Sequence, residues 1–281
     1  MAEKRPVLYL TIGALFLGSI PLARADENSL DRDVHPSIWI VELGGYGVVE
    51  PRFEGSRDYE FGFKPIFDVH RSGDRVWFSS PNDAWSFDLY ESSNFHAGAA
   101  GDVTLKSRFH GDNITARLGS SDLDVKLGAF AEYYPTGNIR TRVELLDAVS
   151  GVTGLMLNLS GDYIWKPQEA LTLSLGPRLQ FVDDTYASEL FSTRAARATG
   201  AFVRYRAEGG INSAGAEFTG TYDWSREFST KLFADYSSLV GDAADSPRVN
   251  LRGSVDQFTV GIGASYKLSV DTTRAGDLLS H

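Results

Sequence analysis

The 281-residue chain contains no cysteine, which excludes disulfides, thiolate zinc sites, iron–sulfur clusters and thiol catalysis together. It also lacks an excess of basic residues, because 27 Lys and Arg stand against 37 Asp and Glu, for a formal net charge of -10. Nucleic acid is bound through a basic face, so this balance excludes nucleic acid as a partner. Only histidine, carboxylate and hydroxyl groups remain for chemistry, and we expect no cofactor.

The first 25 residues have the three parts of a secretory signal peptide. Lys4 and Arg5 form a basic start, Val7–Ile20 is an apolar core, and Ala23–Ala25 fits the small-residue cleavage pattern. We expect cleavage after Ala25. An uncleaved anchor is the alternative, but the apolar core is shorter than the ~20 residues that a spanning helix needs, and no other stretch approaches that length. The exported chain is therefore a soluble periplasmic or secreted protein, or an outer-membrane barrel.

Apolar residues recur at every second position over long stretches, which is the period of a β-strand. The two faces are clearest in residues 122–133, where only Phe130 breaks the alternation, and in residues 170–182, 213–224 and 257–268. Noisier alternation marks eight further segments, so about twelve strands are predicted. These eight segments are residues 37–48, 59–70, 74–80, 84–90, 94–108, 138–147, 151–165 and 228–239.

The lengths of the strands and loops favour a membrane barrel over a soluble sandwich or lipocalin-like barrel. Several strands exceed the ~5–6 residues typical of soluble sheets, and long and short connections alternate. The expected outer loops include Val49–Asp58, Phe109–Ser120, Asp183–Asn212 and Val240–Val255, whereas the outer connection near Pro81–Asn82 is short. The charged face would point into a wet lumen; it carries Lys106, Lys126, Arg140, Arg142, Glu144, Arg178, Glu217, Lys231 and Asp235.

The sequence therefore predicts an all-β fold, a single antiparallel transmembrane β-barrel of about twelve strands, with a range of ten to fourteen. The barrel is expected to occupy residues 37–268. A signal peptide (1–25) and a short periplasmic leader (26–36) precede it, and a C-terminal tail (269–281) follows it.

Catalytic motifs are not evident in the chain. The five histidines form no H-E-x-x-H pair, and the chain has no G-x-S-x-G nucleophile elbow. His96 or His110 beside a serine could serve an outer-membrane hydrolase, but a solvated turn or lumen histidine is the favoured interpretation. We therefore expect no catalytic residue, no metal site and no enzyme activity.

Charged residues in the expected outer loops have two interpretations each. Asp183, Asp184, Asp242 and Asp245 could bind the divalent cations held by lipopolysaccharide, although capping of turns is the favoured role. Arg194, Arg197, Arg204 and Arg206 could pair with lipid phosphates or with these acids.

Three groups of short motifs, in order along most of the chain, resemble the MipA/OmpV family of Gram-negative outer-membrane proteins. The first group runs through Gly44–Gly47, Pro51–Ser56, Asp58-Tyr59 and Pro65; the second is Gly176-Pro177 followed by Asp183–Tyr186; the third is Leu239–Pro247, Gly253-Ser254 and Gln257-Phe258. The resemblance implies an outer-membrane barrel of the cell envelope. The name-giving member is described as a scaffold that joins a lytic murein transglycosylase to a bifunctional penicillin-binding protein.

Two functions follow as expectations. The first is a non-catalytic scaffold for peptidoglycan-processing enzymes, with these two enzymes as possible partners beside outer-membrane lipid and lipopolysaccharide. The second is a porin-like passive channel for small polar solutes, because the predicted lumen face is polar and charged. The predicted turns on the periplasmic side are short, so the leader and the tail are the expected contacts of a scaffold.

Overall fold

The computed structural model describes residues 38–105, 123–193 and 204–271. Eleven strands lie within these ranges. They are β1 (Ile38–Pro51), β2 (Tyr59–Arg71), β3 (Trp85–Glu91), β4 (Phe95–Leu105), β5 (Leu123–Thr136), β6 (Ile139–Ala148), β7 (Gly154–Gln168), β8 (Leu171–Val182), β9 (Gly210–Asp223), β10 (Phe228–Leu239) and β11 (Asp256–Asp271).

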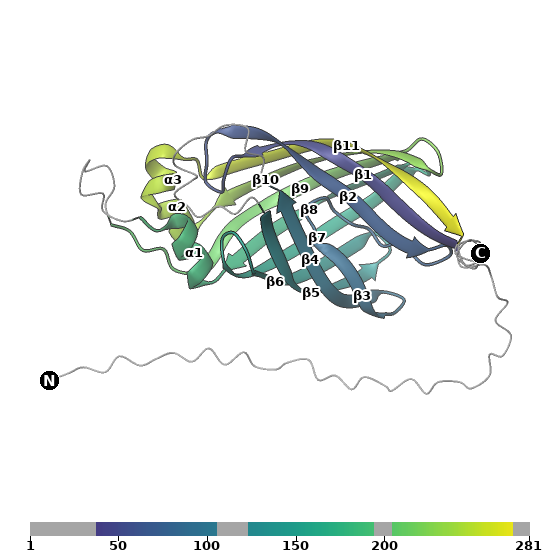
Figure 1. Cartoon of the computed structure of the whole chain (residues 1–281), viewed down its shortest axis with the longest axis horizontal. Helices are drawn as coiled ribbons and strands as arrows, with labels where there is room; N and C mark the ends of the chain where they lie inside the picture. Colours follow the sequence, from purple (N-terminus) through teal and green to yellow (C-terminus); the bar gives the residue numbers. More distant parts are fainter. Residues whose placement is uncertain (1–37, 106–122, 194–203, 272–281) are drawn as a thin grey trace, which may run out of the picture. The chain divides into compact units, whose positions relative to one another are not determined.

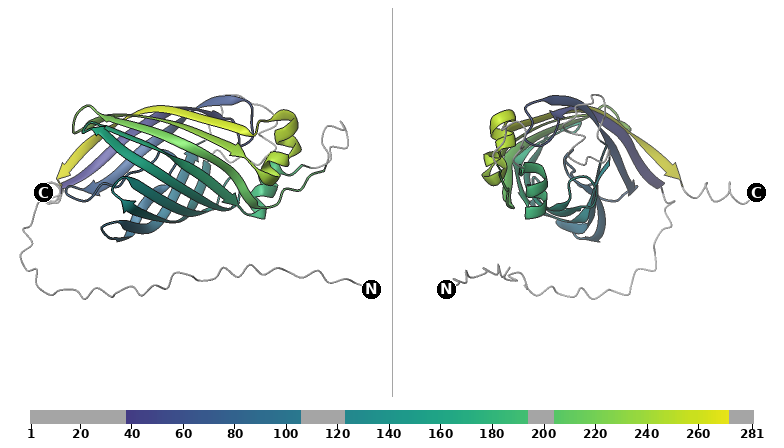
Figure 2. Two further views of the ribbon diagram at one scale, coloured as in Figure 1. Left: turned by 180° about the vertical axis from the view of Figure 1, so that it is seen from behind. Right: turned by 60° about the vertical axis from the view of Figure 1, so that its left-hand side comes forward.

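The strands form one antiparallel sheet in the order β2-β1-β11-β10-β9-β8-β7-β6-β5-β4-β3. The sheet curls into an incomplete barrel, seen from the side in Figure 1 and closer to end-on in the right panel of Figure 2. The first and last strands, β1 and β11, pair with each other, with Ile38 opposite Asp271. This architecture confirms the predicted antiparallel barrel, and its strand number lies within the predicted range.

The predicted strand at residues 74–80 is not part of the sheet. Residues 75–80 form no strand, and within the described residues β2 and β3 are the two edges of the sheet, each with one neighbour. The short turn predicted at Pro81–Asn82 is present, closed by a 3.0 Å hydrogen bond from the Asp83 amide to the Ser80 carbonyl, but it belongs to the segment that contacts the barrel interior. Residues 75–84, here called the strap, pair through side chains with the barrel interior rather than through a backbone ladder.

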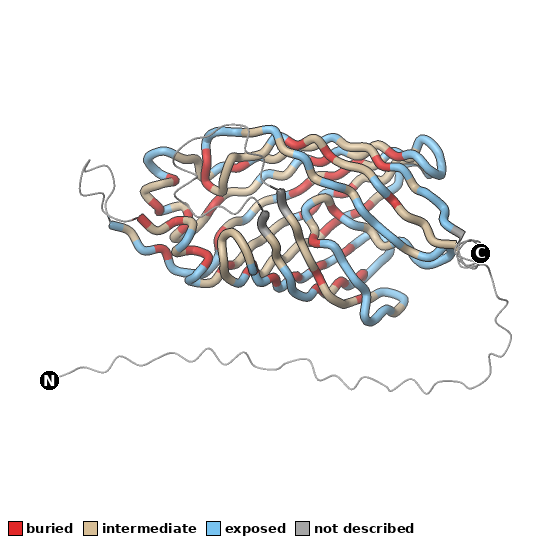
Figure 3. Tube along the Cα trace, viewed as in Figure 1, coloured by how far each residue is buried: buried red, intermediate tan, exposed pale blue. Residues whose placement is uncertain are grey.

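Buried and exposed residues alternate along the strands (Figure 3), but many buried residues are charged and many exposed ones are apolar, the reverse of a soluble protein. Phe61 and Ile262 are 71% and 72% exposed on the outer surface, whereas Glu132 and Arg140 are 1% and 0% exposed inside. Phe130, which breaks the alternation of its strand, is buried and packs beneath the guanidinium of Arg142. A polar interior inside an apolar exterior is expected of a barrel whose solvent is lipid, not of a soluble sandwich.

The two ends of the barrel differ. One end, the turn end, has short connections at residues 92–94, 137–138, 169–170 and 224–227. The other, the cap end, carries the loop at residues 52–58 and three helices, α1 (Asp184–Phe191), α2 (Gly241–Asp245) and α3 (Pro247–Arg252). We call this loop and the three helices the cap. Among the described residues, no helix has the length and hydrophobicity needed to cross a membrane.

Contacts between distant segments hold the cap together. Phe191 and Val249 are buried in one apolar cluster with residues from β7 and β8. The Ser246 hydroxyl donates a 2.6 Å hydrogen bond to the Phe191 carbonyl, and Ser56 forms a β-bridge with Gly253. The three loops that precede β2, β9 and β11 therefore pack as one unit at the cap end.

Candidate functional site

Arg140 on β6 is the centre of a buried charge network in the lumen. Its Nη2 lies 2.5 Å from Asp83 and 2.7 Å from Glu132, and its Nη1 lies 2.7 Å from Asp162. Asp162 is the direct cross-strand neighbour of Arg140, and Glu132 is that of Arg142, so strand register alone brings these groups together. A guanidinium withdrawn from water requires such partners.

Two further arginines extend the network along the wall. The Arg142 Nε donates to Glu144 over 2.6 Å, and this guanidinium also contacts Glu132. The Arg178 Nη2 lies 2.7 Å from Asp162 and 3.1 Å from Glu217. We call these eight side chains the lumenal network; its members are Asp83, Glu132, Arg140, Arg142, Glu144, Asp162, Arg178 and Glu217.

The strap crosses the lumen from one wall to another. Asn82 accepts a 2.7 Å hydrogen bond from Lys64 on β2 and donates a 2.5 Å bond to Glu217 on β9. Asp83 accepts from Arg140 on β6, and the Ala84 amide donates to Glu144 over 3.0 Å. Because these contacts reach β2, β6 and β9, the strap spans the lumen at the level of the network.

The aromatic half of the strap packs near the turn end. Trp77 stacks on His96 with 4.3 Å between ring centroids, and its Nε1 donates a 3.0 Å bond to Glu91. His96 is 3% exposed, with Asp88 2.7 Å from its Nδ1 and Glu132 2.9 Å from its Nε2. Both ring nitrogens are engaged by carboxylates, so neither can take a proton from a hydroxyl nucleophile. His96 lies on β4, so its contacts with Asp88 on β3 and Glu132 on β5 connect these three strands.

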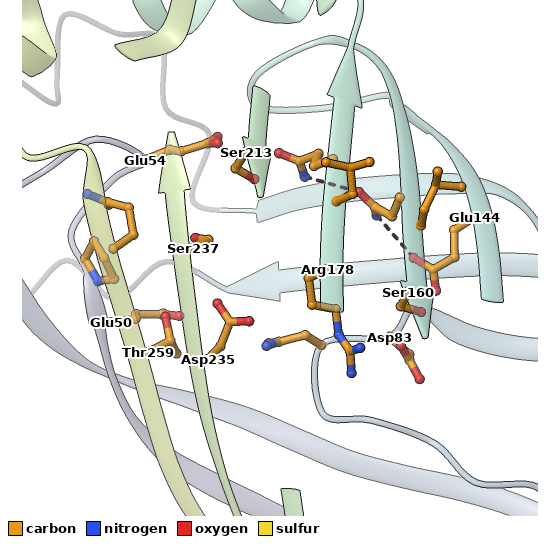
Figure 4. A pocket seen from close by; sticks show the side chains of 17 residues that line it. Glu50, Glu54, Asp83, Glu144, Ser160, Arg178, Ser213, Asp235, Ser237 and Thr259 are labelled. Atoms are coloured by element: carbon orange, nitrogen blue, oxygen red, sulfur yellow. Dashed lines mark hydrogen bonds between the residues drawn. The ribbon is translucent and has the colours of Figure 1, made fainter. Parts of the chain in front are cut away.

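A cavity of about 320 Å³ lies between the cap and the strap (Figure 4). Glu54 of the cap and Asp83 of the strap both line it, and carboxylates outnumber its one basic side chain, Arg178. Asn212 and the Tyr186 hydroxyl donate hydrogen bonds to the Glu54 carboxylate, the latter over 3.3 Å. Burial in the cap raises the pKa of the Glu54 carboxyl above its usual range.

The acidic loop residues mostly serve backbone amides. Asp183 caps α1 by accepting from the Tyr186 amide over 2.8 Å, Asp184 accepts from Gly209, and Asp242 accepts from Glu208. Asp245 is exposed on α2. In the described ranges, no three His, Asp or Glu side chains are grouped to hold a metal ion. These contacts correspond to the turn-capping interpretation.

Several of the named residues lie outside the described ranges. They include His110, Arg194 and Arg197, together with the signal peptide and leader (1–36) and the end of the tail (272–281). Arg204 and Arg206 are described and exposed, close to the cap. Among the five histidines, His70 is also described, and its Nδ1 lies 2.6 Å from Asp68.

Sequence reasoning placed Arg140, Arg142, Arg178 and Glu217 on the lumen face, and the structure brings all four together. It missed the strap residues that contact this network from across the lumen, above all Ser80, Asn82 and Asp83. One available signal was the predicted strand before them, which is short and is followed directly by a proline.

The family comparison gives the clearest result. The model of the family described as MltA-interacting protein MipA matches residues 43–268, which is most of the chain. The chain belongs to the MipA family. Together with the inverted burial of the barrel, this membership identifies an outer-membrane β-barrel protein, as the resemblance of its loop motifs predicted.

The chain is also similar to solved outer-membrane proteins at low identity. The COG4313 outer membrane channel from Pseudomonas putida F1 is 11% identical with a TM-score of 0.40, covering 87% of this chain and 100% of that one. The NanC porin is 9% identical with a TM-score of 0.39, covering 82% and 100%. The N-terminal barrel of Pseudomonas aeruginosa OprF is 14% identical with a TM-score of 0.25, covering 51% and 87%. No curated protein matches the chain by sequence.

Proposed function

We propose that the chain is a non-catalytic outer-membrane scaffold that binds peptidoglycan-processing enzymes, with a lytic murein transglycosylase and a penicillin-binding protein as partners. One observation carries this choice over a passive channel. The strap spans the lumen and is bonded to β2, β6 and β9, which supports an obstructed rather than an open path for solutes in the resting barrel. The name of the family, MltA-interacting protein, supports the choice of partner.

The same geometry supports a role without catalysis. His96 is a described histidine, and the carboxylates of Asp88 and Glu132 contact both of its ring nitrogens. A general base needs a free nitrogen within reach of the proton that it removes. The charged side chains of the lumenal network likewise pair with one another, as expected for a rigid support.

Partners would meet the turn end, which the usual orientation of such barrels places in the periplasm. The described turns there are short, so the leader at residues 26–36 and the tail beyond Asp271 are the proposed contacts. At the other end, the exposed Arg204 and Arg206 would face lipopolysaccharide phosphates. The apolar outer surface would contact lipid.

Binding by the refolded full-length mature chain tests this function. Each enzyme is passed over immobilised barrel in detergent, with a heat-unfolded sample as the control. We expect the folded chain to retain the transglycosylase, and chains without residues 26–36 or 272–281 to retain less. If the folded chain retains neither enzyme, the scaffold proposal is wrong.

A conductance measurement in planar bilayers distinguishes the scaffold from a passive channel. We expect a folded barrel to leave the bilayer sealed for most of a recording. Steady, salt-dependent current steps in the wild-type protein would instead make the passive channel the primary function.

A further inference from the structure

The sheet has two unpaired edges that the membrane makes costly. Strands β2 and β3 each have a neighbour on one side only, and no backbone hydrogen bond joins them to each other in the described residues. Within lipid, backbone N–H and C=O groups have no water to bind, which is why membrane sheets close on themselves. All seven residues of β3 are exposed, so side chains do not cover this edge.

The strap has the direction needed to fill the seam between these edges. Both β2 and β3 run from the cap end to the turn end, since each lies antiparallel to a neighbour that runs the other way. The chain between them must therefore return from the turn end to the cap end. A strand formed by residues 75–80 would lie antiparallel to both edges and would make the twelfth strand of a closed barrel.

The residues of the strap suit a strand between β2 and β3. Val76, Trp77 and Phe78 are residues that favour strands. Val76 is 66% exposed, so the lumenal position leaves this side chain unburied. Pro81 follows the segment and would end the added strand.

Side chains of residues 80–83 and the backbone of Ala84 attach the strap to the lumen wall opposite the seam. Ser80 and Asn82 both donate to the Glu217 carboxylate, and Asp83 accepts from Arg140. In the described residues, no backbone ladder joins residues 75–80 to any strand. The contacts to Glu217 and Arg140 could exchange for water in a wet lumen, while the backbone groups of the strap would gain partners in the seam.

We propose that the strap is a gate, which blocks the lumen when Ser80, Asn82 and Asp83 bind the wall, and opens it when residues 75–80 pair between β2 and β3. In the second state the cavity beneath the cap connects with the turn end. This inference goes beyond the scaffold function and does not depend on it.

A cross-link tests the gate directly, because the chain has no native cysteine. The double variant Ser80→Cys/Glu217→Cys removes the anchor, and a short bis-methanethiosulfonate can restore it. In planar bilayers we expect frequent openings of the unlinked protein, closure on cross-linking and renewed opening on reduction. Folded, heat-modifiable protein whose current does not change with the cross-link would overturn the gate.

A milder pair of variants guards against loss of folding. Asn82→Ala removes two side-chain bonds at an exposed position, and Asn94→Ala in the β3–β4 turn is its matched control. Loss of one bond to a charged partner shifts a two-state equilibrium by about tenfold. We expect Asn82→Ala to open at least about tenfold more often than wild type, since two such bonds are lost, and Asn94→Ala to match wild type. Equal opening by both variants would contradict the anchoring role.

A proline substitution tests whether residues 75–80 form a strand between β2 and β3 in the open state or only leave the lumen wall. Val76→Pro removes a backbone donor that the lumenal state does not use but a ladder position would require. In the Asn82→Ala background, we expect Val76→Pro to shorten the open state, because the strap can no longer pair fully in the seam. Unchanged open times would overturn the twelfth-strand arrangement.

Discussion

Replacing Arg140 with methionine should destabilise the barrel more than any exposed ion-pair substitution. Arg140 is 0% exposed and contacts three carboxylates. After its loss, Glu132 keeps Arg142 and Asp162 keeps Arg178, each through the ion pairs already described. Asp83 loses its cation and retains a 2.8 Å bond from the Ser80 amide. One stranded carboxylate at a buried site costs about 3–5 kcal/mol.

The comparison is with Lys126→Met, which removes a partly exposed pair with Asp102 at 2.7 Å. Such a pair contributes about 0–1 kcal/mol. Both variants are unfolded in urea from lipid vesicles, with tryptophan fluorescence and heat-modifiable gel mobility as probes. The double variant Arg140→Met/Asp83→Asn should recover part of the loss, since the stranded charge is gone. If Arg140→Met costs no more than Lys126→Met, the buried-network argument fails.

Three further predictions concern the outer surface, the sheet and the cap. Ile262→Arg places a charge on the lipid face and should cost about 2–4 kcal/mol, whereas Thr259→Arg on the lumen face of the same strand should cost less; urea unfolding from vesicles compares them. Gly176→Ala should cost about 1–3 kcal/mol, because its Cβ would lie 1.6 Å from the Gly161 carbonyl oxygen; Gly137→Ala, with nothing within 4 Å, should be near neutral in the same assay. The raised pKa of Glu54 means that the folded chain holds this proton where the unfolded chain has released it, so its effect on stability is most favourable below the ordinary pKa of 4.5 and is lost as pH rises through the raised pKa. Glu54→Gln should flatten this pH dependence of the urea midpoint, and a pH profile identical to that of wild type would contradict the assignment.

The fold was largely predictable because its main signal is local. A period of two assigns each side chain to the lipid or lumen face without knowledge of partners, so the position of Ile262 and Arg140 follows from sequence. Register adds the next level, since Glu132 and Arg142 become neighbours once β5 and β6 are paired as a hairpin. Family motifs in the loops added the membrane location.

The position of the strap inside the lumen was not predictable by the same reasoning. Its contacts join residues far apart in sequence, with Asp83 57 positions from Arg140 and Asn82 135 positions from Glu217. Alternation around Trp77 favours a strand, and nothing local shows that the segment leaves the sheet for the interior. Tertiary contacts with a charged wall decided the outcome, and a periodicity count has no access to them.

The strap also explains why a charged lumen does not by itself indicate a pore. Arginines and carboxylates on an inner wall are compatible with water, but here they bind one another and Asp83 of the chain itself. While Asp83 and its neighbours in the strap bind the wall, the β2 and β3 edges stay without the strand that could close them. The polar groups of the strap can find partners in two competing ways. One uses side chains in the wet interior, and the other uses backbone groups at the lipid-facing seam. In the gate that we propose, the balance between hydrated charges and unpaired peptide groups, rather than lumen polarity, therefore sets whether the lumen opens.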